Sequence, residues 1–202
     1  MQIKTKTLRR YGKPFVFALM LLPAIWLFYN WWGALNGLPH GLGFNPQETS
    51  NRFSGDWAIR FLILSLAVSP FAKLIRSPKP ILFRRMIGLF AFFYACLHIS
   101  SYLGMDLLFD WDQLWKDIIK RSYITVGMLA FLLLLPMALT STKGMIRRLG
   151  AKNWQKLHKA VYAIGLLAGF HFIMMRKGWQ LEPLIYMAII LLLLASRFLY
   201  RR

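Results

Sequence analysis

The chain has 202 residues, of which 57% are apolar and 16% aromatic, and it carries a formal net charge of +19. A soluble domain of this size cannot bury that much apolar surface, so the composition excludes a soluble globular protein. The charge alone would suggest nucleic-acid binding. That function is disfavoured because the basic residues cluster between apolar segments, where membrane topology and anionic lipid explain them.

Six apolar runs near the length needed to cross a membrane follow one another along the chain. They cover residues 15–32, 57–75, 85–103, 123–139, 157–175 and 183–195. Together they fill the chain. They predict an all-α fold, an integral membrane bundle of six transmembrane helices that forms a single domain over residues 1–202.

Charged residues alternate between the connections. Basic residues without any acid fill the stretch before residue 15, the second and fourth connections, and the tail after residue 195. All seven acids lie in or beside the first, third and fifth connections. By the positive-inside rule, both termini are expected in the cytoplasm and the odd connections outside.

Three of the four histidines, His98, His158 and His171, lie inside apolar segments. An ionisable side chain in hydrocarbon is costly and marks a functional site, and paired imidazoles between membrane helices are typical axial ligands of haem iron. His98 and His171 each stand about five residues before the outer end of a segment, hence at similar depth. We therefore expect one haem between the third and fifth segments.

Small residues favour this interpretation. Ala91, Ala95 and His98 share one helical stripe, which leaves a shallow face where a flat macrocycle can lie. For a lone membrane histidine, the alternative is a hydrogen bond to a neighbouring helix. On the fifth segment, Gly165 and Gly169 either open one side of the helix or serve helix packing.

His158 precedes His171 by 13 residues, about 20 Å along an ideal helix, and therefore belongs to the cytoplasmic leaflet. The matching positions on the third segment are Arg84 and Arg85. Arginine is a poor metal ligand but suits a haem propionate or a phosphate. A second haem at His158 is thus left open. Arg60, near the outer end of the second segment, is either a propionate partner of the outer haem or an interfacial anchor.

The sequence holds no glycine-rich nucleotide motif in a plausible context. If the protein moves electrons, we expect a lipid-soluble quinol or another protein to supply them. The competing function is a small transporter or assembly protein whose histidines handle protons. It is disfavoured because every acid lies at or outside the ends of the predicted segments.

The residues around the histidines resemble those of the MsrQ family, formerly called YedZ. The resemblance rests on residues 84–102, on Leu139-Thr140-Ser141 and on residues 154–162, in which Leu-His-x-x-x-Tyr occurs on both the third and the fifth segment. It extends to Ser54-Gly55, residues 60–62 and residues 183–186, and so covers nearly the whole chain.

The resemblance implies a ferric-reductase-like transmembrane domain in the bacterial inner membrane that carries b-type haem. Such a subunit passes electrons from the quinone pool to MsrP, a periplasmic molybdopterin enzyme that repairs oxidised methionines in envelope proteins. The family's haem ligands map onto His98, His171 and His158. Compared with eukaryotic ferric reductases, the inner histidine of the third segment and the flavin and nucleotide domain are missing. FMN has been associated with the family, but no motif here places one.

Overall fold

The computed structural model describes residues 5–176 and 180–199, with side chains as far as Arg197 in the last helix. Within these residues every regular element is a helix and no strand occurs. The predicted all-α fold class is therefore confirmed. The tail arginines Arg201 and Arg202, which entered the charge argument, lie outside the described residues.

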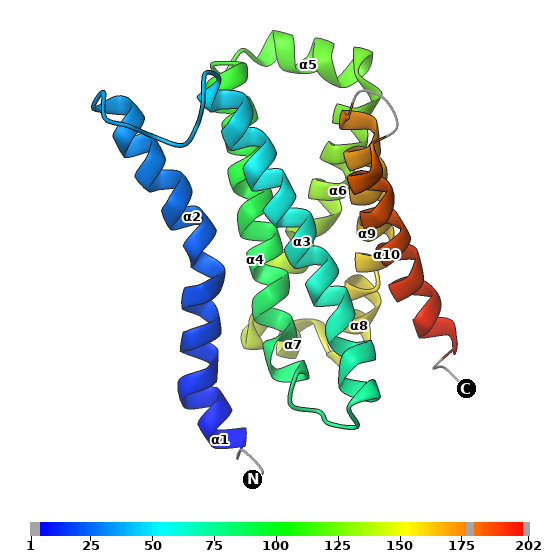
Figure 1. Ribbon diagram of the computed structural model, residues 1–202. Helices are drawn as coiled ribbons and strands as arrows, with labels where there is room; N and C mark the ends of the chain where they lie inside the picture. The colour runs from blue at the N-terminus through cyan, green and yellow to red at the C-terminus, as the bar shows by residue number, and fades with distance from the viewer. Residues whose placement is uncertain (1–4, 177–179, 200–202) are drawn as a thin grey trace.

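The long helices stand side by side, and short helices cap the two ends of the bundle (Figure 1). In chain order the elements are α1 (Thr5–Thr7), the π-helix η1 (Leu8–Gly12), α2 (Lys13–Leu35), α3 (Pro46–Leu74), α4 (Ile81–Ser101), the π-helix η2 (Tyr102–Asp106), α5 (Trp111–Lys120), α6 (Ser122–Leu139), α7 (Lys143–Leu149), α8 (Ala151–His158), α9 (Val161–Met175) and α10 (Leu181–Leu199). The sequence did not predict α5, which crosses one end of the bundle, or α7 at the other end.

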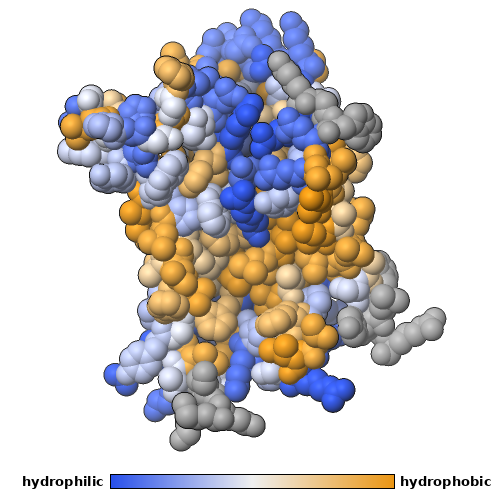
Figure 2. All heavy atoms as spheres, in the orientation of Figure 1, coloured by the Kyte–Doolittle hydropathy of each residue, from blue (hydrophilic) through white to orange (hydrophobic). Residues whose placement is uncertain are grey.

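Five helical segments among the described residues are long and apolar enough to cross a membrane. They are Thr5–Leu35, Pro46–Leu74, Ile81–Asp106, Ser122–Leu139 and Ala151–Met175. Figure 2 shows a belt of apolar residues between two polar ends. The chain is therefore a multi-pass membrane protein. The sixth predicted segment corresponds to α10, which is not among these five, and its crossing stays a prediction.

Helix α3, which corresponds to the second predicted segment, begins at Pro46 and not at residue 57. Asn45 caps it by accepting the backbone N–H of Glu48 at 3.1 Å, and proline suits the first helical position. The first turns are polar, so hydropathy assigned them to a loop. Asp56 consequently lies inside a helix, and the expectation that every acid stands at or outside a segment end is wrong for this residue.

A buried tyrosine joins α2 to α4. Tyr94 is 0% exposed, and its hydroxyl accepts the backbone N–H of Ala24 and donates to the carbonyl of Met20, each at 2.9 Å. These two backbone groups would normally bond each other in an α-helix. The hydroxyl is therefore inserted into the hydrogen-bond ladder of α2, beside Pro23.

An arginine joins α10 to α3. Pro70 lies inside α3 and has no N–H, so it leaves the carbonyl of Leu66 without its usual helical donor. Arg197 of α10 donates from Nη2 to that carbonyl at 3.0 Å. A hydrogen-bond acceptor exposed by a proline in one helix is thus satisfied by the side chain of another.

The glycines of α9 allow α10 to approach closely. A Cβ added to Gly169 would lie 2.8 Å from Cε of Met187, and one added to Gly165 would lie 3.4 Å from Cγ2 of Ile190. These two positions are filled by neighbouring side chains. The helix-packing interpretation is therefore confirmed, and the alternative of an open cofactor face at the two glycines is wrong.

Candidate functional site

His98 of α4 and His171 of α9 face each other near the end of the bundle that α5 crosses (Figure 1), which is called the outer end below, with the opposite end called the inner end. Their ring centroids are 6.0 Å apart and the ring planes are inclined by 76°. A metal between two imidazoles lies about 2 Å from each nitrogen, and the ring centre lies roughly 1 Å behind it, which gives about 6 Å between centroids. The predicted match in depth is confirmed, and the spacing fits one metal held by both rings.

Both imidazoles are oriented by backbone carbonyls. Nδ1 of His98 lies 2.9 Å from the carbonyl oxygen of Asn51, and Nδ1 of His171 lies 2.7 Å from that of Tyr123. A carbonyl only accepts, so each Nδ1 carries the proton and each Nε2 keeps a free lone pair. Metal-bound histidines usually show this arrangement, with the second ring nitrogen donating to a carbonyl or carboxylate.

A cavity of about 300 Å³ opens beside the two rings, between α3, α4, α6 and α9. Cofactor sites typically measure about 300–1,000 Å³. Ala91 and Ala95 line it, which confirms the shallow face expected from the alanine stripe. The cavity reaches Ile164, seven residues before His171 and thus about 10 Å deeper along an ideal helix. Its depth and its mostly apolar lining suit a large, largely apolar ligand.

Three arginines, Arg52, Arg121 and Arg176, also line the cavity. The Arg176 side chain is only 19% exposed and pairs with Glu182 at 3.6 Å. Guanidinium groups bind carboxylates through two parallel hydrogen bonds. The cavity therefore offers cations that would suit the propionates of a haem.

Arg60 is held away from this wall. Its Nε donates to the Tyr186 hydroxyl at 2.9 Å, and its Nη2 lies 3.8 Å from the Glu182 carboxylate. Arg60 does not line the cavity, although it shares Glu182 with Arg176, which does. Its role as a propionate partner stays a prediction.

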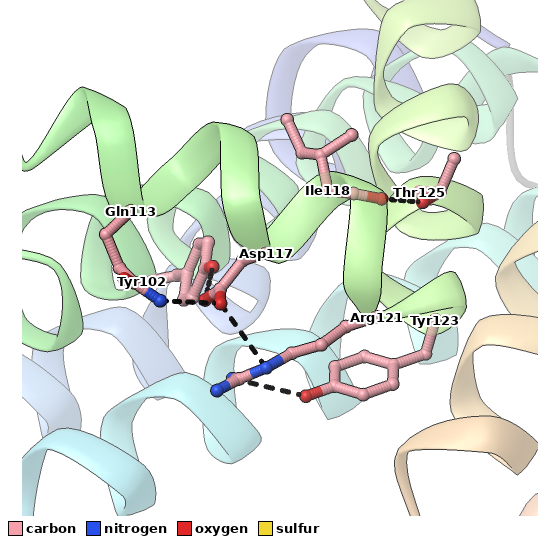
Figure 3. Close-up of polar contacts among 7 residues, drawn as sticks. All are labelled: Tyr102, Gln113, Asp117, Ile118, Arg121, Tyr123 and Thr125. Atoms are coloured by element: carbon pink, nitrogen blue, oxygen red, sulfur yellow. Dashed lines mark hydrogen bonds and ion pairs between the residues drawn. The ribbon is translucent and has the colours of Figure 1, made fainter.

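A buried carboxylate ties α5 to the site (Figure 3). Asp117 is 4% exposed and accepts the Tyr102 hydroxyl at 2.7 Å, Gln113 Nε2 at 2.8 Å and Arg121 Nε at 3.4 Å. Arg121 also contacts the Tyr123 hydroxyl, and this hydrogen bond, together with nearby negative charge, raises the pKa of the guanidinium. Arg121 is therefore a fixed cation beside the cavity.

His158 has different surroundings. It ends α8, and the turn at residues 159–160 separates it from α9, which carries His171. Its ring stacks on Trp154 at 3.9 Å between centroids, and its Nε2 lies 3.4 Å from Oγ1 of Thr140. The predicted segment 157–175 is thus not one continuous helix, and its two histidines contact different neighbours.

The two inner arginines also differ from each other. Arg84 is half-buried, donates from Nη1 to the Ser69 hydroxyl at 3.2 Å, and is close enough to His158 to act on it electrostatically. Arg85 is exposed. The structure brings Arg84 but not Arg85 toward His158, and the propionate or phosphate role of both stays a prediction.

Several site residues were missed from the sequence. Asn51 and Tyr123 hold the histidines through backbone carbonyls, so their side chains give no signal of this role in the sequence. Arg121 and Arg176 stand next to segment ends, where a positional argument could have found them. Asp117 shares the buried face of α5 with Leu114, which is a helical spacing that the sequence does show.

Comparison with known proteins defines the class. Residues 54–169 match the family model described as "Ferric reductase like transmembrane component". This range includes His98 and His158 and ends shortly before His171. The fold and this match make the chain a ferric reductase-like transmembrane protein.

Curated relatives define the family more narrowly. The chain is 48% identical over 188 residues to the "Protein-methionine-sulfoxide reductase heme-binding subunit MsrQ" of Rhodospirillum rubrum, an alignment that covers 93% of this chain and 88% of the relative. Proteins of the same name from Caulobacter vibrioides and Xanthomonas euvesicatoria are 45% and 43% identical over 82% and 96% of this chain, and over 79% and 88% of their own lengths. The chain belongs to the MsrQ family, as the sequence motifs indicated.

Proposed function

We propose that this protein is the haem-binding electron-transfer subunit of a bacterial protein-methionine-sulfoxide reductase system, with one b-type haem held between His98 and His171. The observation that carries the proposal is the pair of rings, 6.0 Å apart, whose Nδ1 atoms are both engaged by carbonyls. His98 and His171 would together hold the iron of a haem, which would then supply electron transfer and not substrate binding.

Haem, when bound, supplies a one-electron carrier at the outer end of the bundle. The remaining work falls to the protein. The carbonyls of Asn51 and Tyr123 fix the tautomer of each ligand and raise its basicity. Arg121 and Arg176 would hold the propionates, while Ala91 and its apolar neighbours would exclude water from the ring.

The proposed electron donor is a quinol of the membrane pool, and the proposed acceptor is an MsrP-like periplasmic molybdoenzyme. Membership in the MsrQ family supports an acceptor from the reductase system, because relatives of similar length are named as subunits of a protein-methionine-sulfoxide reductase. The quinol is proposed from the family resemblance of the sequence motifs. The proposal includes no flavin, because only the family resemblance suggests that FMN binds. A second haem at His158 is a separate extension, because the Nε2 of this histidine faces Thr140.

The proposed topology is a single domain over residues 1–202 that crosses the bacterial inner membrane six times, with both termini in the cytoplasm and α10 as the sixth span. It is supported by α1 and the C-terminal end of α10, which lie toward the same end of the bundle (Figure 1). A reporter fused after Arg202 should be active in the cytoplasm, and one inserted near Asp112 should be active outside.

The decisive experiment is a reduced-minus-oxidised spectrum of the purified protein. A low-spin bis-histidine haem spectrum is expected, and a quinol analogue should reduce it, whereas NADPH alone should not. A colourless preparation from haem-replete cells contradicts haem binding. Rapid reduction by NADPH without any other protein contradicts the quinol route.

One observation favours a second candidate function, proton handling by a small transporter. Asp56 lines the same cavity as both histidines, so the cavity does contain a carboxylate. Proton flux into liposomes that contain haem-free protein would support this function. Flux absent from haem-free protein, together with a haem spectrum in membranes, excludes it.

A further inference from the structure

The same local arrangement surrounds both outer histidines. In each case the ring Nδ1 donates to a backbone carbonyl of the neighbouring helix, and a glycine stands four residues further along that helix. The two sets are Asn51 and Gly55 of α3 with His98 of α4, and Tyr123 and Gly127 of α6 with His171 of α9. Two helix pairs that are remote in sequence thus present their histidines in the same way.

Each glycine lies directly against its histidine ring. A Cβ added to Gly55 would lie 3.0 Å from Nδ1 of His98, and one added to Gly127 would lie 2.8 Å from both Nδ1 and Cε1 of His171. Real Cβ atoms do not approach other heavy atoms as closely as 2.8 Å, and a contact at 3.0 Å requires the neighbouring ring to shift by a few tenths of an ångström. Even a methyl group at either position would therefore push the ring from its place.

Helix geometry explains the four-residue spacing. In an α-helix the carbonyl of residue i accepts the N–H of residue i+4, so the Cα of residue i+4 stands beside that oxygen. A side chain there would shield the second lone pair of the carbonyl, whereas glycine leaves it open. The carbonyls of Asn51 and Tyr123 are thereby free to accept an imidazole N–H from the adjacent helix.

We propose that Gly55 and Gly127 are positioning residues that form two matched cradles, each fixing the tautomer and plane of one axial imidazole. The inference rests on the proposed haem ligation by His98 and His171 and extends it to two glycines that line the same cavity but would supply no ligand to the iron. His158 offers a contrast, because its contact runs through Nε2 to the Thr140 hydroxyl instead of through Nδ1 to a backbone carbonyl.

The competing explanation is that these glycines only let neighbouring helices pack closely. The two explanations predict different results for Gly→Ala variants. Loss of close packing alone lowers thermal stability and leaves the electronic state of bound haem unchanged. Displacement of a ligand ring weakens haem binding and changes the low-spin electron paramagnetic resonance signal and the midpoint potential, because outer-shell partners set ligand orientation and basicity.

The experiment compares Gly55→Ala and Gly127→Ala with Gly88→Ala in the full chain. Gly88 is the matched control, because it is a helical glycine of α4 whose added Cβ would meet only the Ser65 hydroxyl oxygen, at 3.4 Å. Haem per protein, the resonance signal, the midpoint potential and the thermal midpoint are measured for each variant. We expect about 10–100-fold weaker haem binding in Gly127→Ala, an effect in the same direction in Gly55→Ala, and wild-type values in Gly88→Ala.

The inference is overturned if Gly55→Ala and Gly127→Ala hold stoichiometric haem with the wild-type resonance signal and potential. That result does not contradict the proposed haem ligation. The ligation is contradicted if the wild-type protein binds no haem, or if variants without His98 and His171 keep it. If Gly127→Ala does not accumulate in membranes, Gly55→Ala decides alone, because its added carbon meets His98 at the longer distance.

Discussion

The outer and inner halves of the bundle contain the same residue type in different chemical situations. In the outer half, His98 and His171 face each other with Nε2 free. In the inner half, His158 stacks on Trp154, and its Nε2 lies against the Thr140 hydroxyl. The neighbouring main chain, and not the presence of an intramembrane histidine, therefore determines which ring is ready to bind a metal.

The comparison also separates similarity in sequence from similarity in space. The repeated Leu-His-x-x-x-Tyr pattern contains His98 and His158, yet the structure pairs His98 with His171, which Phe170 precedes. The repeated feature in space is a carbonyl with a glycine four residues later, on α3 and on α6. A sequence pattern that identifies a family thus does not show which of its residues pair in the site.

The largest expected effect comes from removing an outer ligand. His98→Ala or His171→Ala should abolish the low-spin haem spectrum, because alanine leaves one axial position of the iron without a nitrogen. Haem content and spectra at matched expression measure this. The control is His40→Ala, which changes an exposed histidine of the loop between α2 and α3. A variant that lacks His171 yet retains the normal spectrum would falsify the outer pairing.

The next effect tests whether α5 belongs to the outer half. Asp117→Ala leaves the Tyr102 hydroxyl and the Arg121 guanidinium without their shared acceptor. Since Arg121 is half exposed, we expect a modest loss of about 1–3 kcal/mol in the free energy of unfolding. Thermal melts in detergent measure it, with Asp112→Ala, an exposed acid of the same helix, as the control. Equal melting of both variants would show that α5 is not anchored through Asp117.

A smaller effect should follow from changing the charge at the cavity. Arg176→Gln removes a cation that favours the reduced haem, because reduction adds an electron to the site. An interaction of about 1 kcal/mol corresponds to a potential lower by about 40 mV. Redox titration measures the shift, and Arg147→Gln, at the opposite end of the bundle on α7, should not show it. A rise in potential would contradict this placement of the propionates.

The smallest effect on the outer haem is expected from His158→Ala. The ring lies in a different helix from His171 and contacts neither outer histidine nor its carbonyl partner. The outer low-spin signal and its potential should remain at wild-type values, even if total haem content falls. Damage as severe as that of His98→Ala would remove the distinction between the two halves.

Much of the fold could be predicted because hydropathy reports burial in lipid. The all-α class, the depth of His98 and His171 and the alanine face on α4 all follow from spacing along apolar helices. Hydropathy does not predict the polar helices. The first turns of α3 were assigned to a loop, and α5 and α7 were missed, because caps and tertiary contacts stabilise them instead of lipid. The cradles could not be predicted, because every residue has a backbone carbonyl and the sequence therefore does not show which carbonyl accepts the imidazole N–H.

The bond between Arg197 and the carbonyl of Leu66 has a consequence for assembly. The ribosome makes these two residues 131 positions apart, so α3 is complete long before its donor exists. Until α10 docks, the carbonyl released by Pro70 has no partner in α3, and an unsatisfied backbone group in hydrocarbon costs several kcal/mol. Docking of α10 therefore completes the hydrogen bonding of α3. A chain that stops short of Arg197 would keep the carbonyl of Leu66 without this hydrogen bond inside the membrane.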